Sequence, residues 1–266
     1  MLANVFLKTL HDQRRSLPAW IIAVALLVAT YVALWPSIKG QPSMNEFLAQ
    51  MPEAFRSLFA TSGADMSTPV GYIQIELMSF MAPIVVLIYT IGAGSGAVAG
   101  EEDRHTMEML LANPVGRTAV VLEKFAAMVV GSALIAVFTG ASLVLEGALA
   151  DMSLPAGNVA AAMVHLCLLG LVFGSLALAL SAWTGRTGIS KGVPAAAAIV
   201  GYIVNGLAPL VDWLKPSQKI SPFYQYIGHD PLRAGLSWGS IGIAAATVAV
   251  LVGAAVVGFR RRDVGA

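Results

Sequence analysis

The chain has 266 residues, of which 57% are hydrophobic and only 12% are charged, with a mean hydropathy of +0.76. Because a soluble domain carries about 25% charged residues, this composition indicates an integral membrane protein, with membrane lipid as a partner. The formal net charge of +1 provides no polybasic patch for nucleic acid, and the single cysteine, Cys167, cannot form a disulfide within the chain.

Six apolar stretches are long enough, or nearly so, to cross a membrane as helices, which takes about 20 residues. We place these spans at about residues 17–35, 72–99, 119–145, 159–183, 193–213 and 238–259. Residues 1–16 alternate apolar and charged side chains, as a short helix in the membrane interface does. The predicted fold class is an all-α integral membrane protein, with residues 1–266 forming a single transmembrane domain.

Six spans place both termini on one side of the membrane, and the basic residues indicate which side. With the termini in the cytoplasm, 11 of the 16 lysines and arginines lie on the cytoplasmic side. This bias agrees with the positive-inside rule. We therefore expect a multi-pass protein of the cell (cytoplasmic) membrane with both termini cytoplasmic.

Two outer connections contain helix signals. Residues 43–46 have capping-box spacing and Pro52 suits a first helical position, which predicts two short surface helices between spans one and two. The connection at residues 214–237 is interrupted by three prolines. We expect it to be a loop with at most one short or partly re-entrant helix.

The second span contains small residues and a proline. Gly92, Gly96 and Gly100 fall on one helical face, where small residues let another helix approach closely. The same letters contain a GxGxxA pattern, but a dinucleotide site needs a preceding strand, and these residues lie within an apolar helix. Pro83 removes one backbone donor and is expected to kink this span.

Residues 100–117, GEEDRHTMEMLLANPVGR, are densely charged and begin with three consecutive acids. On a helix starting at Glu101, the polar residues occupy one face, and Met107 and Leu110 lie on another. Asn113 precedes Pro114 and is therefore biased away from helical geometry, which ends the segment. We predict a short amphipathic helix joined rigidly to the second span.

The polar residues do not form a recognisable catalytic set. Glu102 and His105 have the E-x-x-H spacing of di-iron bundles, but those sites need a second such pair and further carboxylates. The chain has no H-E-x-x-H, G-x-S-x-G or G-x-x-x-x-G-K-[ST] pattern. We expect no catalytic, cofactor-binding or metal-ligating residues, and no ATP hydrolysis by this chain.

The stretch of residues 100–117 resembles a loop of the type-two ABC exporter permeases that reads GE…GT…LL…P…R. The residues that carry the resemblance, in order and spacing, are Gly100-Glu101-Glu102, Thr106, Glu108, Leu110-Leu111, Pro114 and Arg117. His105 stands where many of these relatives have glycine. The amphipathic amino-terminal segment, the six spans and the closing FRRRD extend the resemblance over essentially the whole chain. These permeases are membrane subunits whose ATPases are separate chains.

The resemblance implies a permease dimer, with a homodimer favoured over a heterodimer, and two ATP-binding cassette subunits that hold ATP and Mg²⁺. It implies that the loop between spans two and three is a coupling helix seated in a groove of the ATPase. The residues carried over as ATPase contacts are Glu101, Glu102, Asp103, Arg104, Thr106, Glu108, Pro114 and Arg117. Arg186 and Lys191 mark a possible second cytoplasmic contact.

The substrate is less defined by the sequence. Ionisable groups within or near the ends of spans default to functional candidates, and these are Glu76, Glu146 and His165, to which Asn205 adds an amide. We take Glu76, His165 and Asn205 as the candidates for a substrate path. The otherwise apolar spans favour outward movement of a hydrophobic or amphipathic substrate, such as a drug, an antibiotic or a lipid-like molecule.

Three alternatives stay open at this point. One is an ABC permease that serves maturation of a periplasmic metalloenzyme or signalling. Another is a secondary transporter or channel that needs no ATPase, although the paired interrupted helices typical of such proteins are not evident. The third is a membrane-embedded enzyme.

Overall fold

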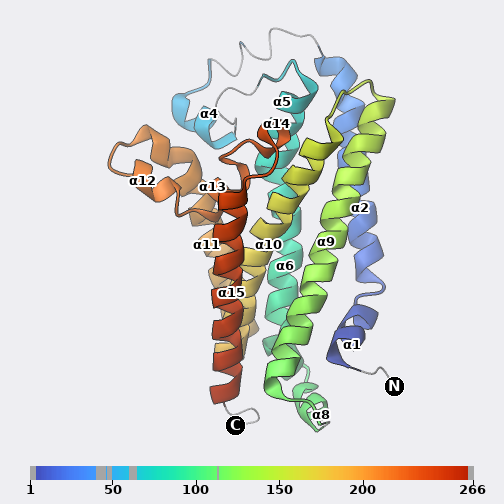
Figure 1. The fold of residues 1–266 in the computed structure, drawn as a ribbon, viewed down its shortest axis with the longest axis vertical. Coiled ribbons are helices and arrows are strands. Elements are labelled where there is room, and N and C mark those ends of the chain that lie inside the picture. The colour runs from blue at the N-terminus through green and yellow to red at the C-terminus, as the bar shows by residue number, and fades with distance from the viewer. Residues whose placement is uncertain (1–3, 40–45, 47–49, 60–64, 113, 263–266) are drawn as a thin grey trace.

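The computed structural model describes residues 4–39, 46, 50–59, 65–112 and 114–262. Within these residues the chain is helical, and six long helices run side by side as an elongated bundle (Figure 1). Each is long and apolar enough to cross a membrane, which confirms the prediction of six candidate spans. They are α2 (Ser16–Ile38), the composite Pro69–Ala97, α9 (Arg117–Leu149), α10 (Ala156–Thr184), α11 (Thr187–Leu207, continued by the 3₁₀ turn η2, Ala208–Leu210) and α15 (Trp238–Arg261).

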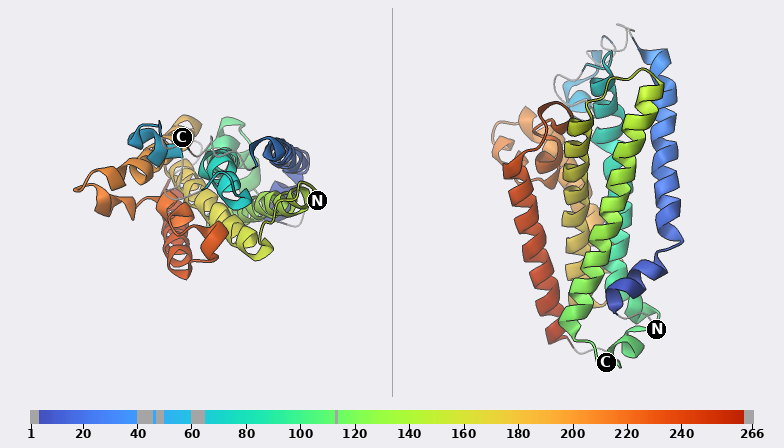
Figure 2. Two further views of the ribbon diagram at one scale, coloured as in Figure 1. Left: turned by 90° about the horizontal axis from the view of Figure 1, so that it is seen from above. Right: turned by 45° about the vertical axis from the view of Figure 1, so that its right-hand side comes forward.

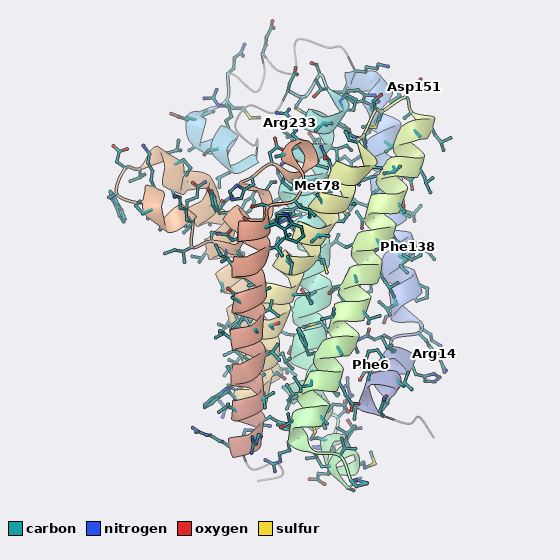
Figure 3. The ribbon with its side chains drawn as sticks, viewed as in Figure 1. Phe6, Arg14, Met78, Phe138, Asp151 and Arg233 are labelled. Carbon is teal, nitrogen blue, oxygen red and sulfur yellow. The ribbon has the colours of Figure 1, made fainter. Side chains whose placement is uncertain are left out.

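Shorter helices occupy the two ends of the bundle. The end that carries α1 (Val5–Asp12), α7 (Ala99–Asp103), α8 (Met107–Leu111) and the last turn of α15 is called here the terminal end (Figure 2). The opposite end carries α4 (Glu53–Phe59), α12 (Lys215–Gln218), α13 (Pro222–Ile227) and α14 (Pro231–Ala234). Figure 3 shows the same division, with Phe6 and Arg14 at the terminal end and Asp151 and Arg233 at the opposite end.

Local sequence signals account for several helix ends. Asn4 caps α1 by accepting the Leu7 N–H at 2.8 Å, and Ser237 caps α15 by accepting from Ser240. Gly185 ends α10 in the left-handed region at φ 62°, where glycine is favoured. Because α11 begins at Thr187, rather than at the predicted residue 193, the α10–α11 corner consists of only Gly185 and Arg186.

The centre of the bundle is α10, which packs against α6 (Ala82–Ala97), α9, α11, α13 and α15. Glycines permit this close packing. A Cβ at Gly94 of α6 would overlap the backbone carbonyl oxygen of Gly174 in α10, and a Cβ at Gly174 would lie 2.9 Å from Thr90 Cβ. The two helices therefore cross where neither can carry a side chain, as small-residue contacts in lipid do.

Within the described residues, no other helix of this chain packs closely on Gly92, Gly96 or Gly100, so their predicted role in helix packing stays a prediction for contacts with another chain. Among the residues that the structure describes, a Cβ at Gly92 or Gly96 would meet nothing within 4 Å, and one at Gly100 would meet only ordinary contacts at 3.8 Å or more. The four-residue spacing predicts that Gly92, Gly96 and Gly100 share one helix face. Helix α10 packs instead on the face of α6 that contains Gly94.

The second span is irregular before Pro83. It consists of α5 (Pro69–Ile73), the π-helix η1 (Gln74–Met81) and α6, so the expected kink is a widened turn that ends just before the proline. The Ala82 N–H bonds to the Leu77 carbonyl, five residues earlier. In this pattern the donor for the Met78 carbonyl would be residue 83, and proline has no N–H.

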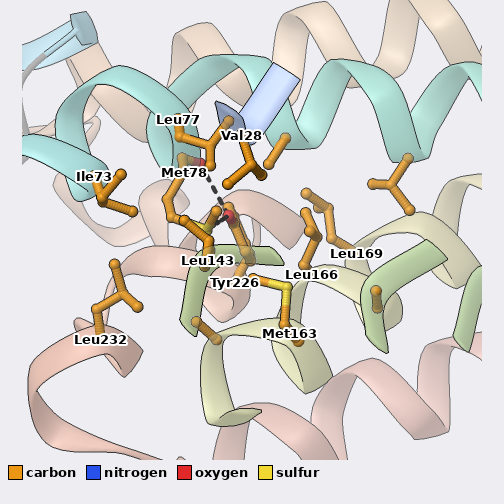
Figure 4. Close-up of a cluster of buried hydrophobic side chains, with 14 of the residues drawn as sticks. Val28, Ile73, Leu77, Met78, Leu143, Met163, Leu166, Leu169, Tyr226 and Leu232 are labelled. Atoms are coloured by element: carbon orange, nitrogen blue, oxygen red, sulfur yellow. Dashed lines mark hydrogen bonds between the residues drawn. The ribbon is translucent and has the colours of Figure 1, made fainter. Parts of the chain in front are cut away.

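The hydroxyl of Tyr226 in α13 supplies the missing donor. It bonds to the Met78 carbonyl oxygen at 2.9 Å, within the largest cluster of buried side chains (Figure 4). Tyr226 belongs to the connection at residues 214–237, which forms three short helices, α12, α13 and α14. The prediction that this connection is a loop with at most one helix is therefore wrong.

The other predictions about connections between spans have different outcomes. Of the two short helices predicted between spans one and two, α4 is present at Glu53–Phe59. The capping box at residues 43–46 lies outside the described residues except for Glu46, and so does Asn113.

Replacing Gly94 with alanine is expected to destabilise the protein by about 2 kcal/mol, because the new methyl group has no space against the α10 backbone. Thermal unfolding in detergent would measure the change. Gly92→Ala on the same helix is the control, and it should leave the melting temperature unchanged or slightly higher. Equal melting temperatures for the two variants would contradict the assigned packing face.

Tyr226→Phe is expected to cost about 1–3 kcal/mol, because it leaves the buried Met78 carbonyl without a donor while keeping the aromatic ring. Tyr224→Phe on the same helix is the matched control, since its hydroxyl forms no hydrogen bond with the part of the chain that the structure describes. A melting temperature for Tyr226→Phe equal to that of Tyr224→Phe would show that the hydroxyl contributes nothing.

Candidate functional site

The charged stretch between the second and third spans forms two short helices, so the prediction of one amphipathic helix is wrong. We call residues 99–111, which comprise α7, α8 and the turn between them, the α7–α8 segment. The turn is formed at His105, whose φ of 55° lies in the left-handed region. Glycine adopts this conformation without strain, whereas a residue with a Cβ atom adopts it less readily.

Glu101 is the buried member of the acidic run. Its exposed fraction is 5%, and its Oε1 lies 2.5 Å from the Nζ of Lys124, which is also buried at 6% exposed. The Thr106 hydroxyl donates to the other carboxylate oxygen, and Lys8 Nζ lies 3.7 Å from Oε1. Glu101, which the sequence places on the polar face of this segment, therefore faces α9 and not solvent.

These contacts determine the charge state of Glu101. Burial raises the pKa of its carboxyl, but the charge and hydrogen bond of Lys124, the Thr106 hydroxyl and the charge of Lys8 outweigh burial and lower the pKa to about 2. The carboxylate is ionised at neutral pH. A buried carboxylate and ammonium are each costly without the other, so the pair holds α7 against α9.

The same site includes α1. Lys8 of α1 approaches Glu101, and the backbone N–H of Phe6 donates to Glu123 Oε2 of α9 at 2.9 Å. Val5 packs in a buried cluster with Met107 and Val121. The α7–α8 segment is thus attached to α1 and α9 through both charge and apolar contact.

A second group of contacts attaches the segment to the end of α15. The Glu102 carboxylate pairs with the Arg262 guanidinium, and Arg117 of α9 donates to the carbonyls of Phe259, at 3.1 Å, and Arg262. The Arg117 guanidinium also lies over the Phe259 ring, 5.6 Å from its centroid.

The residues expected to contact a partner separate into two groups. Glu101, Thr106 and Arg117 form hydrogen bonds within the chain, and Glu102 is partly buried against Arg262. Their assignment as ATPase contacts stays a prediction. The exposed residues of the expected set are Asp103, Arg104, Glu108 and Pro114. Met109, which was not among the expected contacts, is 65% exposed on α8.

Arg186 and Lys191 are exposed at the start of α11. Gly185, which precedes Arg186, lies against Glu102 of the α7–α8 segment. Whether they contact a partner stays a prediction.

The structure does not bring the three substrate-path candidates together. Within the described residues, no hydrogen bond joins any two of Glu76, His165 and Asn205, which lie on η1, α10 and α11. His165 is buried, accepts the Ser237 N–H at 3.2 Å and lines a cavity of about 70 Å³ between α10, α13 and α15. Their part in a substrate path stays a prediction.

Sequence reasoning missed the internal partners Lys124, Lys8 and Arg262. Lys124 carried a signal, because a lysine inside a long apolar helix is costly unless it has a partner. Among the described residues, no group of three or more His, Cys, Asp or Glu side chains is arranged to hold a metal.

The fold and the site together define a multi-pass membrane protein with a buried ion pair, Glu101 and Lys124, at one end of an apolar helical bundle. A family model described as an ABC-2 family transporter protein matches residues 3–264, so the chain belongs to this family. It is a membrane subunit of the kind that generally pairs with ATP-binding subunits and typically lacks ATPase motifs of its own. No curated protein is similar enough to the chain to be matched.

Glu101→Gln is expected to lower the free energy of unfolding at pH 7 by about 3 kcal/mol, because the buried Lys124 ammonium loses its counter-charge. The folded-state pKa of about 2 lies below the ordinary 4.5, so the wild-type carboxylate contributes fully above pH 4.5 and loses its contribution as the pH falls toward 2. The difference between wild type and variant should therefore shrink over that range.

Unfolding in detergent at a series of pH values would measure this difference. Glu108→Gln, which removes the same charge from an exposed position of the same segment, is the control and should change stability little. A Glu101→Gln variant as stable as Glu108→Gln at pH 7 would contradict the assigned pair.

Proposed function

We propose that this chain is the permease subunit of an ATP-driven ABC exporter, and that the exposed surface of the α7–α8 segment docks on an ATP-binding cassette subunit. The observation that carries the proposal is the burial of Glu101 against Lys124 beneath an exposed, charged surface. A partner that moves this surface moves α9 and α1 with it, because separating the pair is costly.

Physical coupling requires that the contacted element be attached to a span and that the partner bind it differently in two states. The α7–α8 segment meets the first requirement, because α7 follows α6 after Val98 and packs against α10 and α11. The second requirement is supplied by an ATPase that closes on ATP and opens after hydrolysis. ATP and Mg²⁺ would be held by that partner.

We place the terminal end of the bundle in the cytoplasm. Arg14, Arg15, Arg104, Arg260 and Arg261 are exposed there, and a surplus of basic residues favours the cytoplasmic side. This orientation would give the ATP-binding subunit access to the α7–α8 segment.

The proposed complex contains two permeases and two ATP-binding subunits, with a homodimer favoured. Gly92 and Gly96 support a permease pair, since they leave open space on α6 where a second copy could approach. The apolar spans support a hydrophobic or amphipathic substrate that is moved outward.

The proposal is tested by isolating the tagged permease from native membranes and identifying any ATP-binding subunit that co-purifies. The double variant Asp103→Lys, Glu108→Lys should reduce co-purification and stimulation of ATP hydrolysis on the order of tenfold, because it reverses two charges on the surface where the partner is proposed to dock. Expression and melting temperature should not change, since both side chains are exposed.

Glu53→Lys, an exposed charge reversal on α4 at the opposite end, is the matched control and should behave as wild type. If wild-type permease isolates without an ATP-binding subunit, the proposed function is wrong. If it isolates with one that binds the double variant equally well, the docking surface is wrong.

A further inference from the structure

Three segments that are distant in sequence meet at the terminal end of α15. They are Glu102 of α7, Gly185 of the α10–α11 corner, and Arg262 directly after α15. The Glu102 carboxylate pairs with the Arg262 guanidinium. A Cβ at Gly185 would overlap both the guanidinium and the carboxylate, so the corner lies directly against the ion pair.

The position of Arg262 is fixed by contacts other than the ion pair. Its carbonyl, like that of Phe259, accepts from the Arg117 guanidinium of α9. The Phe259 side chain is fully buried. Trp183 near the end of α10 donates its Nε1–H to the Ala254 carbonyl at 2.8 Å, and Gly258 leaves the space that its ring occupies. Arg262 is therefore presented to Glu102 from a firmly packed helix end.

The ion pair is partly shielded from water, with side-chain exposures of 20% for Arg262 and 22% for Glu102. The Nη2 of Arg262 donates to Glu102, whereas its Nη1 is buried and has no hydrogen-bond partner within the described residues. Arg260 and Arg261, which precede it, have exposed side chains. The three consecutive arginines thus have different environments, and only the third faces the α7–α8 segment.

We infer that Arg262 is a positioning residue that joins the α7–α8 segment and the α10–α11 corner to the last helix. Through it, a displacement of Glu102 acts directly on α10, α11 and α15, in addition to its path through α6. In one respect this inference rests on the proposed function, because the displacement is that caused by the docked ATP-binding subunit.

The link itself is tested on the permease alone, in lipid nanodiscs, by backbone hydrogen exchange. Arg262→Ala should raise exchange several-fold to about tenfold at residues 101–106 and 184–187, since each contains amides whose bonds lie beside the ion pair. Arg261→Ala, which removes the same charge from the preceding exposed position, should leave exchange at both segments unchanged.

Two further variants separate a specific pair from a general structural effect. Arg262→Lys should restore part of the protection, and the exchanged pair Glu102→Arg, Arg262→Glu should protect both segments better than either single change does. If Arg262→Ala leaves exchange in both segments at the wild-type level, or if the exchanged pair is no better than its singles, the inference is overturned. Neither outcome depends on an ATP-binding subunit.

The effect on coupling is measured in the isolated complex. Arg262→Ala should retain the ATP-binding subunit and lower the stimulation of ATP hydrolysis by the permease several-fold, whereas Arg261→Ala should not. Unchanged stimulation in a complex whose exchange has risen would show that the link is only structural, which also overturns the positioning role. Absence of an ATP-binding subunit from the wild-type preparation would count against the proposed function, and the exchange experiment would still decide the link.

Discussion

The terminal end of the bundle depends on one interaction, the buried pair of Glu101 and Lys124. Their 2.5 Å contact unites two charges that would each be costly to bury separately. Lys124 lies in α9, Glu101 lies in α7, and Lys8 of α1 approaches the same carboxylate. Three helices from separate parts of the chain therefore have only one favourable arrangement at this end.

This constraint separates the charged residues by role. Consecutive residues of a helix point in directions about 100° apart, so the run from Glu101 to Asp103 cannot face a single partner. Glu101 faces α9, Glu102 faces Arg262, and Asp103 is exposed. The inner two attach the segment to the bundle, and the outer residue belongs to the surface that another chain can reach.

The sequence was sufficient for the spans because a helix in lipid must be both long and apolar, and hydropathy measures both. It was not sufficient for the charge pairs, because a sequence shows that Glu101 is acidic without showing that a residue of another helix lies beside it. Helix rotation was also undetermined. Gly92 and Gly94 are equally small, but only Gly94 faces Gly174, and that depends on where α10 packs. His105 did carry a local signal, since it stands where many permeases with the resembling loop have glycine, and its φ of 55° lies in the left-handed region that favours glycine.

The prolines of residues 214–237 show how one residue type supports two interpretations. Proline within a sequence predicts a break in a helix, but Pro216, Pro222 and Pro231 each lie in the first turn of a short helix, where no N–H is needed. Pro83 acts in the opposite way, because its missing N–H leaves the Met78 carbonyl in the π-helix without a backbone donor. Tyr226 of α13 satisfies that carbonyl. Pro83 in the second span leaves a carbonyl without a donor, and α13, which begins at Pro222 before the sixth span, provides that donor. This hydrogen bond holds α13 against the second span at the opposite end of the bundle.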